Sequence, residues 1–290
     1  MTTPTGDAML LATLVNDSQT AHGFELLVMP FMRNALLAGT LIALAAGVIG
    51  YFVVLRDLAF ATHAIAHIGF PGATLAVLLS ITPVVGLLVG CVGGGLTIGL
   101  AGHRARDREI VTGTVLAFMS GLGILFSSVG SSQSGTVTNI LFGNILAISS
   151  TQVVLFAVIT AVTLAALAVT GRRMMFSSID PAVAQARGVN VRALSALFLV
   201  LMSLVIAISV TVVGVLLIFA LLVTPAATAV KMSARPMYVI AIATAIALVS
   251  VWSGLVVATY QPWPPTFVIT TIACVLWLVL PPLKNAVVRR

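Results

Sequence analysis

Charged side chains are scarce in this sequence. Of its 290 residues only 7% are charged and 60% are hydrophobic, and the mean hydropathy is +1.20. A soluble domain carries roughly 25% charged residues, so this chain cannot cover itself with groups that water solvates. The composition excludes an ordinary soluble globular domain and indicates a surface that faces lipid.

The sequence also lacks the signatures of several other classes. Its only lysines, Lys231 and Lys284, are not preceded by the glycines of a G-x-x-x-x-G-K-[ST] loop, so the chain cannot bind ATP in that way. Cys91 and Cys274 lie in apolar runs without a C-x-x-C pair and are interpreted as packed core residues. Residues 1–23 contain no basic segment followed by an apolar one, so no cleaved signal peptide is expected.

The apolar runs are long enough to cross a bilayer. They extend over about 17–23 residues, which matches a hydrocarbon core of roughly 30 Å, and they lack the alternation of barrel strands. We predict an all-α polytopic membrane protein with about eight or nine transmembrane helices. The candidate spans are residues 34–54, 58–80, 84–102, 110–128, 151–170, 193–212, 213–230, 237–259 and 266–283. The junction Val213-Gly214 has no polar loop, so 193–230 is either two spans or one long helix followed by a short half-helix.

The chain divides around these spans. Residues 1–32 are predicted to form an N-terminal tail with an interfacial segment at 24–32, residues 33–284 the transmembrane domain with a large loop at 172–192, and residues 285–290 a basic C-terminus. Gly86, Gly90 and Gly94 recur at every fourth position, which favours close packing of a neighbouring helix.

The net charge of +7 is distributed in a way that indicates a membrane topology and no nucleic-acid partner. Every odd-numbered span is followed by arginine or lysine, whereas the loops at 81–83, 129–150 and 260–265 contain neither. Cytoplasmic loops carry the excess of basic residues, so the C-terminus is predicted to be cytoplasmic. The acidic N-terminal tail then lies outside if the number of spans is odd.

Two histidines stand out within the second span. His63 and His67 are four residues apart, which stacks both imidazoles on one face of a helix. Neutral imidazole is the commonest side-chain ligand of transition metals, so the pair predicts a site for a divalent metal ion. The alternative is that each histidine hydrogen-bonds a neighbouring helix. Further ligands could come from Met119, Asn139, Asn144 or Thr224.

The spans contain no aspartate or glutamate, which disfavours a carrier driven by protons through an intramembrane carboxylate. ATP-driven transport would need a separate nucleotide-binding subunit, and the loop at 172–192 offers a docking element. Asp180 can cap a short helix that begins at Pro181 and stops at Gly188. The alternative for this segment is a solvated connector.

The chain resembles the membrane permease of the metal-uptake ABC transporters, the manganese, zinc and iron family. The resemblance covers residues 28–283. It rests on the order and spacing of the segments PFMRNALLAG (30–39), AIAHIGFPG (64–72), NILFGNILAIS (139–149), 180–189, VGVLL (213–217) and LLVTPAATA (221–229).

This resemblance implies an importer subunit of a bacterial cell membrane, with a fold similar to that of the cobalamin importer permeases. It implies a homodimer, a dimer of cytoplasmic ABC ATPases, an extracytoplasmic metal-binding protein and no permanently bound cofactor. The transported ion would be manganese, zinc or iron. His67 matches the histidine of the family signature, whereas His63 stands where many members have aspartate, which leaves the metal open.

The segment 180–188 would be the coupling helix that docks on the ATPase, with Asp180, Pro181, Ala184, Arg187 and Gly188 as its coupling residues. Two alternatives remain: a permease for a chelated metal such as cobalamin or an iron–siderophore, and a self-sufficient secondary carrier or channel.

Overall fold

The computed structural model describes residues 29–101, 105–129, 139–215, 217–261 and 263–288. Seven helices in this part of the chain contain a stretch long and apolar enough to cross a membrane, and two shorter apolar segments accompany them. The elements are α2 (Pro30–Leu55), α3 (Ala59–Leu78), α4 (Pro83–Ala101), α5 (Ala105–Val129), η1 (Ile145–Ala147), α7 (Ser150–Ile179), α8 (Pro181–Ala186), α9 (Val191–Val213), α10 (Ile218–Leu222), α11 (Thr224–Met232), α12 (Pro236–Tyr260) and α13 (Pro265–Val288).

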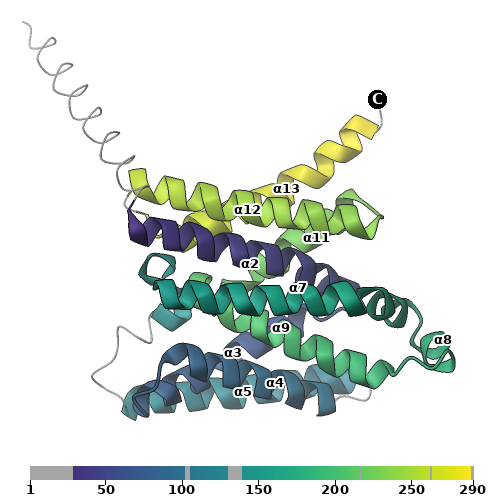
Figure 1. The fold of residues 1–290 in the computed structure, drawn as a ribbon, viewed down its shortest axis with the longest axis horizontal. Coiled ribbons are helices and arrows are strands. Elements are labelled where there is room, and N and C mark those ends of the chain that lie inside the picture. The colour runs from purple at the N-terminus through teal and green to yellow at the C-terminus, as the bar shows by residue number, and fades with distance from the viewer. Residues whose placement is uncertain (1–28, 102–104, 130–138, 216, 262, 289–290) are drawn as a thin grey trace, which may run out of the picture.

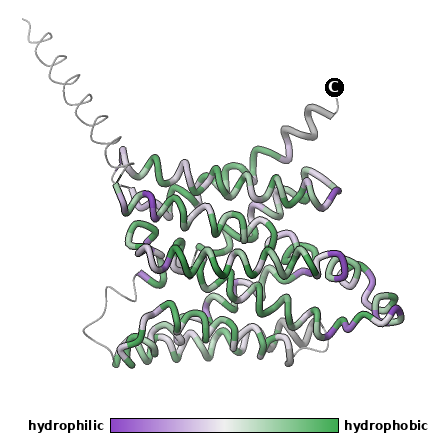
Figure 2. The backbone as a smooth tube through the Cα atoms, in the orientation of Figure 1, coloured by the Kyte–Doolittle hydropathy of each residue, from purple (hydrophilic) through white to green (hydrophobic). Residues whose placement is uncertain are grey.

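The helices form a layered bundle (Figure 1). Helices α12 and α13 lie on one side, α2, α7 and α9 occupy the middle, and α3, α4 and α5 form the opposite side. This order agrees with the packing of α2 on both α12 and α7, and of α4 on both α3 and α9. The backbone is mostly hydrophobic along the long helices, and hydrophilic residues gather toward the end that carries α8 (Figure 2).

The all-helical fold is confirmed, and most predicted spans correspond to one helix. The exception is the predicted span at 213–230, which is not a continuous helix. Helix α9 ends at Gly214, whose φ of 83° and ψ of 164° leave the helical region. Two short helices, α10 and α11, follow and meet at Val223. Of the two predicted possibilities for 193–230, a long helix followed by a short, broken one is therefore correct.

Part of the predicted loop at 129–150 folds into the bundle. Ile145 of η1 is buried, and its Cδ1 packs beside Gly39, the tenth residue of α2 and thus about 14 Å along that helix. The Asn144 amide donates to the Thr211 carbonyl at 3.3 Å. Residues 130–138 of this loop, and residues 24–28 of the predicted interfacial segment, lie outside the described residues.

The predicted loop at 172–192 is shorter than expected. Helix α7 continues to Ile179, so Arg172 and Arg173 lie on its last turns and not in a loop. Arginines interrupt a hydrophobic run but not a helix, because arginine is a good helix former wherever the helix leaves the hydrocarbon. Only a few residues then separate α7 from α8 and α8 from α9.

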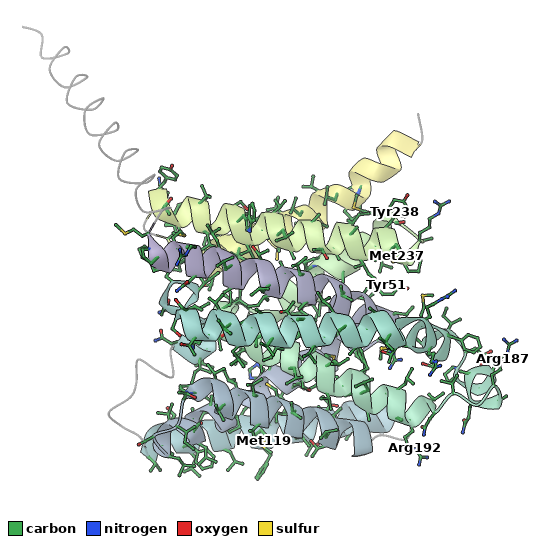
Figure 3. All side chains as sticks on the ribbon, viewed as in Figure 1. Tyr51, Met119, Arg187, Arg192, Met237 and Tyr238 are labelled. Atoms are coloured by element: carbon green, nitrogen blue, oxygen red, sulfur yellow. The ribbon has the colours of Figure 1, made fainter. Side chains whose placement is uncertain are left out.

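The basic residues mark one end of the bundle, and the start of α2 marks the other. Arg187 and Arg192 lie at the α8 end, together with Met237 and Tyr238 at the start of α12 (Figure 3). The start of α2 lies at the other end, where the Asn34 Nδ2 donates to the Ile148 carbonyl at 3.3 Å.

The small-residue face of α4 packs against α3, as its spacing predicted. An added Cβ at Gly86 would overlap the Gly72 carbonyl, and one at Gly90 would lie 3.2 Å from the Gly69 Cα. These two helices therefore approach backbone to backbone, which fixes the position of the histidine-bearing helix α3.

Candidate metal pathway and coupling site

His63 and His67 form a ring pair on α3. Their ring centroids are 4.6 Å apart and the rings are inclined by 67°. Both side chains are half-buried. They are the fifth and ninth residues of α3, about 6 and 12 Å from its start, so the pair lies in the half of the bundle nearer α8.

The face of α3 that carries the pair points toward α5. His63, His67 and Phe70 share one helical face by their spacing, and the Phe70 ring packs where a Cβ on Gly123 of α5 would lie. The neighbouring face of α3 is turned to α9, because the Thr62 hydroxyl donates to the Met202 Sδ at 3.6 Å. The histidines therefore do not point into the α3–α4 contact.

One histidine atom is left without a partner in a single copy of the chain. The Nδ1 of His63 is buried and accepts or donates no hydrogen bond among the described residues. A buried polar atom without a partner is unfavourable, and a lone pair on an imidazole nitrogen is also what a metal ion binds. The prediction that each histidine hydrogen-bonds a neighbouring helix is thus unsupported for this atom.

The pair does not form a complete metal cage by itself. Within the described residues no group of three or more His, Cys, Asp or Glu side chains is placed to hold one ion. Met119 lies on α5 (Figure 3), the helix that packs against α3. Asn139 and Asn144 belong to the segment before α7 that is hydrogen-bonded to the end of α9. Thr224 is the first residue of α11. That the two imidazoles hold a passing metal ion stays a prediction; two nitrogen donors would bind it weakly, as transient passage requires.

The capped helix predicted at 180–188 is present as α8. The Asp180 Oδ1 accepts a hydrogen bond from the Val183 amide at 3.0 Å, and Pro181 is the first helical residue. Gly188 has a φ of 79°, and the Val189 amide donates to the Ala184 carbonyl at 3.0 Å. These bonds form a Schellman stop after less than two turns.

Helix α8 is held on the end of α7. Ala184 is completely buried, and the Arg187 guanidinium lies 5.9 Å from the centre of the Phe176 ring of α7. The other residues of α8 are exposed, and Val183 exposes 42% of its surface. The segment is therefore a capped helix with an exposed surface. Its role in coupling remains a prediction.

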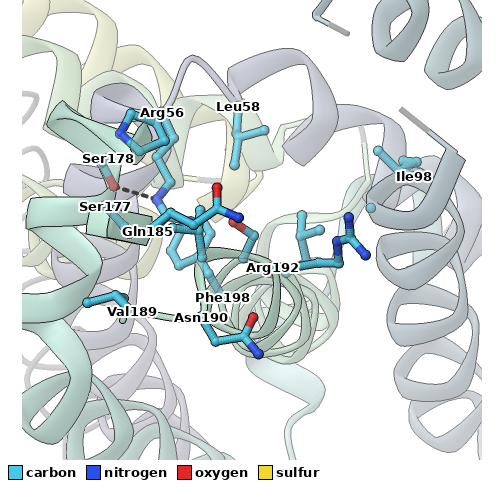
Figure 4. A pocket seen from close by; sticks show the side chains of 15 residues that line it. Arg56, Leu58, Ile98, Ser177, Ser178, Gln185, Val189, Asn190, Arg192 and Phe198 are labelled. Carbon is cyan, nitrogen blue, oxygen red and sulfur yellow. Dashed lines mark hydrogen bonds between the residues drawn. The ribbon is translucent and has the colours of Figure 1, made fainter. Parts of the chain in front are cut away.

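A cavity of about 940 Å³ lies beside α8 (Figure 4). Polar side chains from α7, α8 and α9 and from the turn before α3 line it, among them Arg56, Ser177, Ser178, Gln185 and Arg192. Neither histidine belongs to its lining. The sequence indicated Arg56 only as one of the cytoplasmic basic residues, because nothing local reveals that its partners lie on α7.

Gly143 and Gly214 were also not recognised as a pair. Both have positive φ, 75° and 83°, and an added Cβ at either would lie within 2.5 Å of the other's backbone nitrogen. The Val215 amide donates to the Ile140 carbonyl at 3.2 Å. The only signal available was that each glycine belongs to a segment on which the resemblance rests.

These features define a multi-pass membrane permease: a bundle of apolar helices with a half-buried histidine pair and an ordered helix projecting from its basic end. The chain belongs to the ABC 3 transport family, whose model matches residues 28–281.

The chain is similar to the "Manganese transport system membrane protein MntC" of Listeria innocua, with 30% identity over 78% of this chain and 80% of that protein. It is similar to the "High-affinity zinc uptake system membrane protein ZnuB" of Haemophilus influenzae, with 26% identity over 78% and 87% of the two chains. Among solved structures it resembles "PsaBC from Streptococcus pneumoniae in complex with Fab", with a TM-score of 0.80 and 26% identity over 90% and 94%. The match extends along nearly the whole bundle, so the fold is that of a metal-type ABC permease.

Proposed function

We propose that this chain is the membrane-spanning subunit of an ATP-driven importer that moves Mn²⁺ or Zn²⁺ into the cytoplasm. The observation that carries the proposal is the His63–His67 pair, in which the buried Nδ1 of His63 has no hydrogen-bond partner in the described part of the chain. The family relationship and the metals named for its relatives support the direction and the cargo.

A separate ATPase is part of the proposal. The sequence has no P-loop, so ATP hydrolysis requires a partner subunit. Helix α8 offers the docking surface, because it is rigidly capped, lies at the basic end of the bundle and exposes Val183. The positive-inside rule places that end in the cytoplasm, where ATP is available.

A second copy of the chain would complete the pathway. The apolar part of α5 is only 11% buried, the least of the candidate spans. An added Cβ on Gly113 or Gly121 would meet nothing within 4 Å, and open glycines on a transmembrane helix favour close approach of another helix. Since the histidine face of α3 is turned toward α5, a partner on α5 would place the two histidine pairs near one central passage.

Reconstitution tests the function. We expect proteoliposomes that contain the permease with its ATPase and the extracytoplasmic binding protein to accumulate Mn²⁺ or Zn²⁺ when ATP is present on the α8 side. Permease alone is expected to accumulate neither ion. Uptake by the permease alone would instead establish a secondary carrier or channel, and ATP-dependent uptake of cobalamin or a ferric siderophore without uptake of free ions would establish a chelate permease.

The cap of α8 supplies a prediction with a matched pair of variants. Asp180→Ala removes the acceptor of the Val183 amide, which destabilises a helix by about 1 kcal/mol. Because a helix this short is marginal by itself, we expect metal uptake to fall by up to about fivefold. Asp180→Asn keeps an equally good cap and is expected to retain uptake. Equal loss in both variants would mean that the negative charge matters and the cap does not.

A further inference from the structure

Arg56 joins parts of the chain that are distant in sequence. It occupies the turn between α2 and α3, and its Nε donates to the Ser178 Oγ at 2.7 Å (Figure 4). Its Nη2 donates to the Met174 carbonyl at 3.2 Å and to the Ser177 Oγ at 3.3 Å. All three acceptors belong to the last turns of α7, so the guanidinium group is hydrogen-bonded to the end of that helix.

The same side chain also rests on α9. The guanidinium carbon lies 5.0 Å from the centre of the Phe198 ring, which is completely buried. Burial lowers the pKa of Arg56 to about 10, which leaves the group protonated at neutral pH. A cation held over an aromatic face and bonded through a planar fork has one fixed geometry, which lysine cannot reproduce.

The turn that carries Arg56 is itself closed. The Leu58 amide donates to the Val53 carbonyl at 2.9 Å, and the Asp57 amide donates to the Val54 carbonyl at 3.4 Å. Asp57 has a φ of 53°, the left-handed conformation of a Schellman stop, here without glycine. Leu58 is buried and α3 begins at the next residue. Because this hydrogen-bonded turn and the buried Leu58 join Arg56 to α3, we expect a displacement of Arg56 to move α3 as well.

Helix α7 is joined just as tightly to α8. Asp180 alone separates Ile179 from Pro181, and it is both the last cap of α7 and the first cap of α8. Among the described elements α8 packs on α7 and the start of α9, whereas α3 has no extensive packing with either α7 or α8. Arg56 thus bridges the end of α7 and the start of α3 directly, whereas these helices otherwise connect through α9 and through α2.

We propose that Arg56 is a positioning residue that transmits the movement of α8 through the end of α7 to α3, and so links ATP hydrolysis to the exposure of the His63–His67 pair. This inference rests on the proposed function. Because α9 and α2 offer further routes between α8 and α3, loss of Arg56 weakens the coupling without abolishing it.

The quantity that tests this link is the number of metal ions taken up per ATP hydrolysed. A variant that merely folds less well lowers uptake and hydrolysis in proportion and leaves this ratio unchanged. For Arg56→Gln in the reconstituted complex, with Mn²⁺ and Zn²⁺ as probes, we expect the ratio to fall at least about fivefold, the usual size of a coupling between sites. Arg56→Lys, which keeps the charge but loses the fork, is expected to restore it only in part.

Two further variants sharpen the test. Ser177→Ala combined with Ser178→Ala removes two acceptors on the α7 side and is expected to lower the same ratio. Arg235→Gln is the matched control, because Arg235 also lies at the basic end and stacks on an aromatic ring, Tyr238 at 5.9 Å, but does not bridge α7 and α3. It is expected to keep the wild-type ratio.

The possible outcomes distinguish a failure of the proposed role of Arg56 from a failure of the proposed function. If the wild-type complex transports and Arg56→Gln keeps the wild-type ratio, the link is wrong and the proposed function stands. A ratio lowered equally by Arg235→Gln would also overturn the link, since any loss of basic charge would then suffice. If the wild-type complex shows no ATP-dependent uptake, the proposed function fails and the link with it.

Discussion

Replacing His67 with alanine is expected to reduce uptake of Mn²⁺ and Zn²⁺ by at least about tenfold, since even the loss of an outer-shell partner costs a metal site roughly 10–100-fold. Two imidazoles on α3 are the candidate ligands, and their centroids lie 4.6 Å apart. Removing one leaves a single nitrogen donor for an ion that must shed water to pass. Uptake of each radioactive ion by cells that express the complete transporter measures the effect, with the amount of assembled complex determined in the same membranes.

The companion variant His63→Asp separates the loss of a ligand from a change of ligand. A carboxylate can still bind the ion but is a harder donor, which suits Mn²⁺ better than Zn²⁺. We expect uptake to persist and the ratio of Mn²⁺ to Zn²⁺ uptake to rise relative to the wild type. Undiminished uptake of both ions by His67→Ala would show that the pair is structural and does not lie on the path.

The helices and the histidine pair could be predicted because both depend on local pattern. A hydrophobic run of sufficient length predicts a span whatever surrounds it, and a spacing of four residues places His63 and His67 on one face of any helix. The same holds for α8, since the cap at Asp180 and the stop at Gly188 lie within the segment itself. Local signals of this kind need no knowledge of the rest of the fold.

A junction at Val213-Gly214 was predicted, but hydropathy could not show what breaks the helix there, because residues 213–223 are as apolar as the helix before them. What ends α9 is a contact with a distant segment: the Asn144 amide bonds the Thr211 carbonyl and the Val215 amide bonds the Ile140 carbonyl. Backbone groups freed inside a membrane protein must find partners in the protein. Here the end of α9 and the segment 140–144 supply some of each other's hydrogen-bond partners. The sequence of either segment alone does not show this pairing.

Arg56 illustrates the same limit for the site. Its charge and position predict which side of the membrane it occupies, but not that its donors reach Met174, Ser177 and Ser178. Hydrogen-bond partners more than a hundred residues away depend on how helices pack. The groups that complete the metal site and the surfaces that cover α5 and α8 depend on partner chains. The sequence of this chain alone therefore does not predict them.

Replacing Gly214 with alanine is expected to destabilise the permease strongly. Its φ of 83° and ψ of 164° fall in a region that essentially only glycine adopts, and strained backbone of this kind costs roughly 1–3 kcal/mol per residue. In addition, the new Cβ would overlap the Leu141 carbonyl oxygen and the backbone of Phe142 and Gly143. Against a total stability of about 5–15 kcal/mol, both terms together should lower the unfolding temperature of the detergent-solubilised protein markedly.

Two other glycines separate the contributions to that loss. Gly188 has a similar φ of 79° but open space around its Cβ position, and Gly93 lies within α4 with open space and no positive φ. Gly188→Ala therefore carries the backbone strain without the overlap, and Gly93→Ala carries neither and gains helix propensity, about 1 kcal/mol. The unfolding temperatures should rank Gly93→Ala first, Gly188→Ala next and Gly214→Ala last. If Gly214→Ala unfolds at a temperature no lower than Gly188→Ala, the segments 140–144 and 211–215 are not in contact at Gly214. The hydrogen bonds between them would then differ from those described.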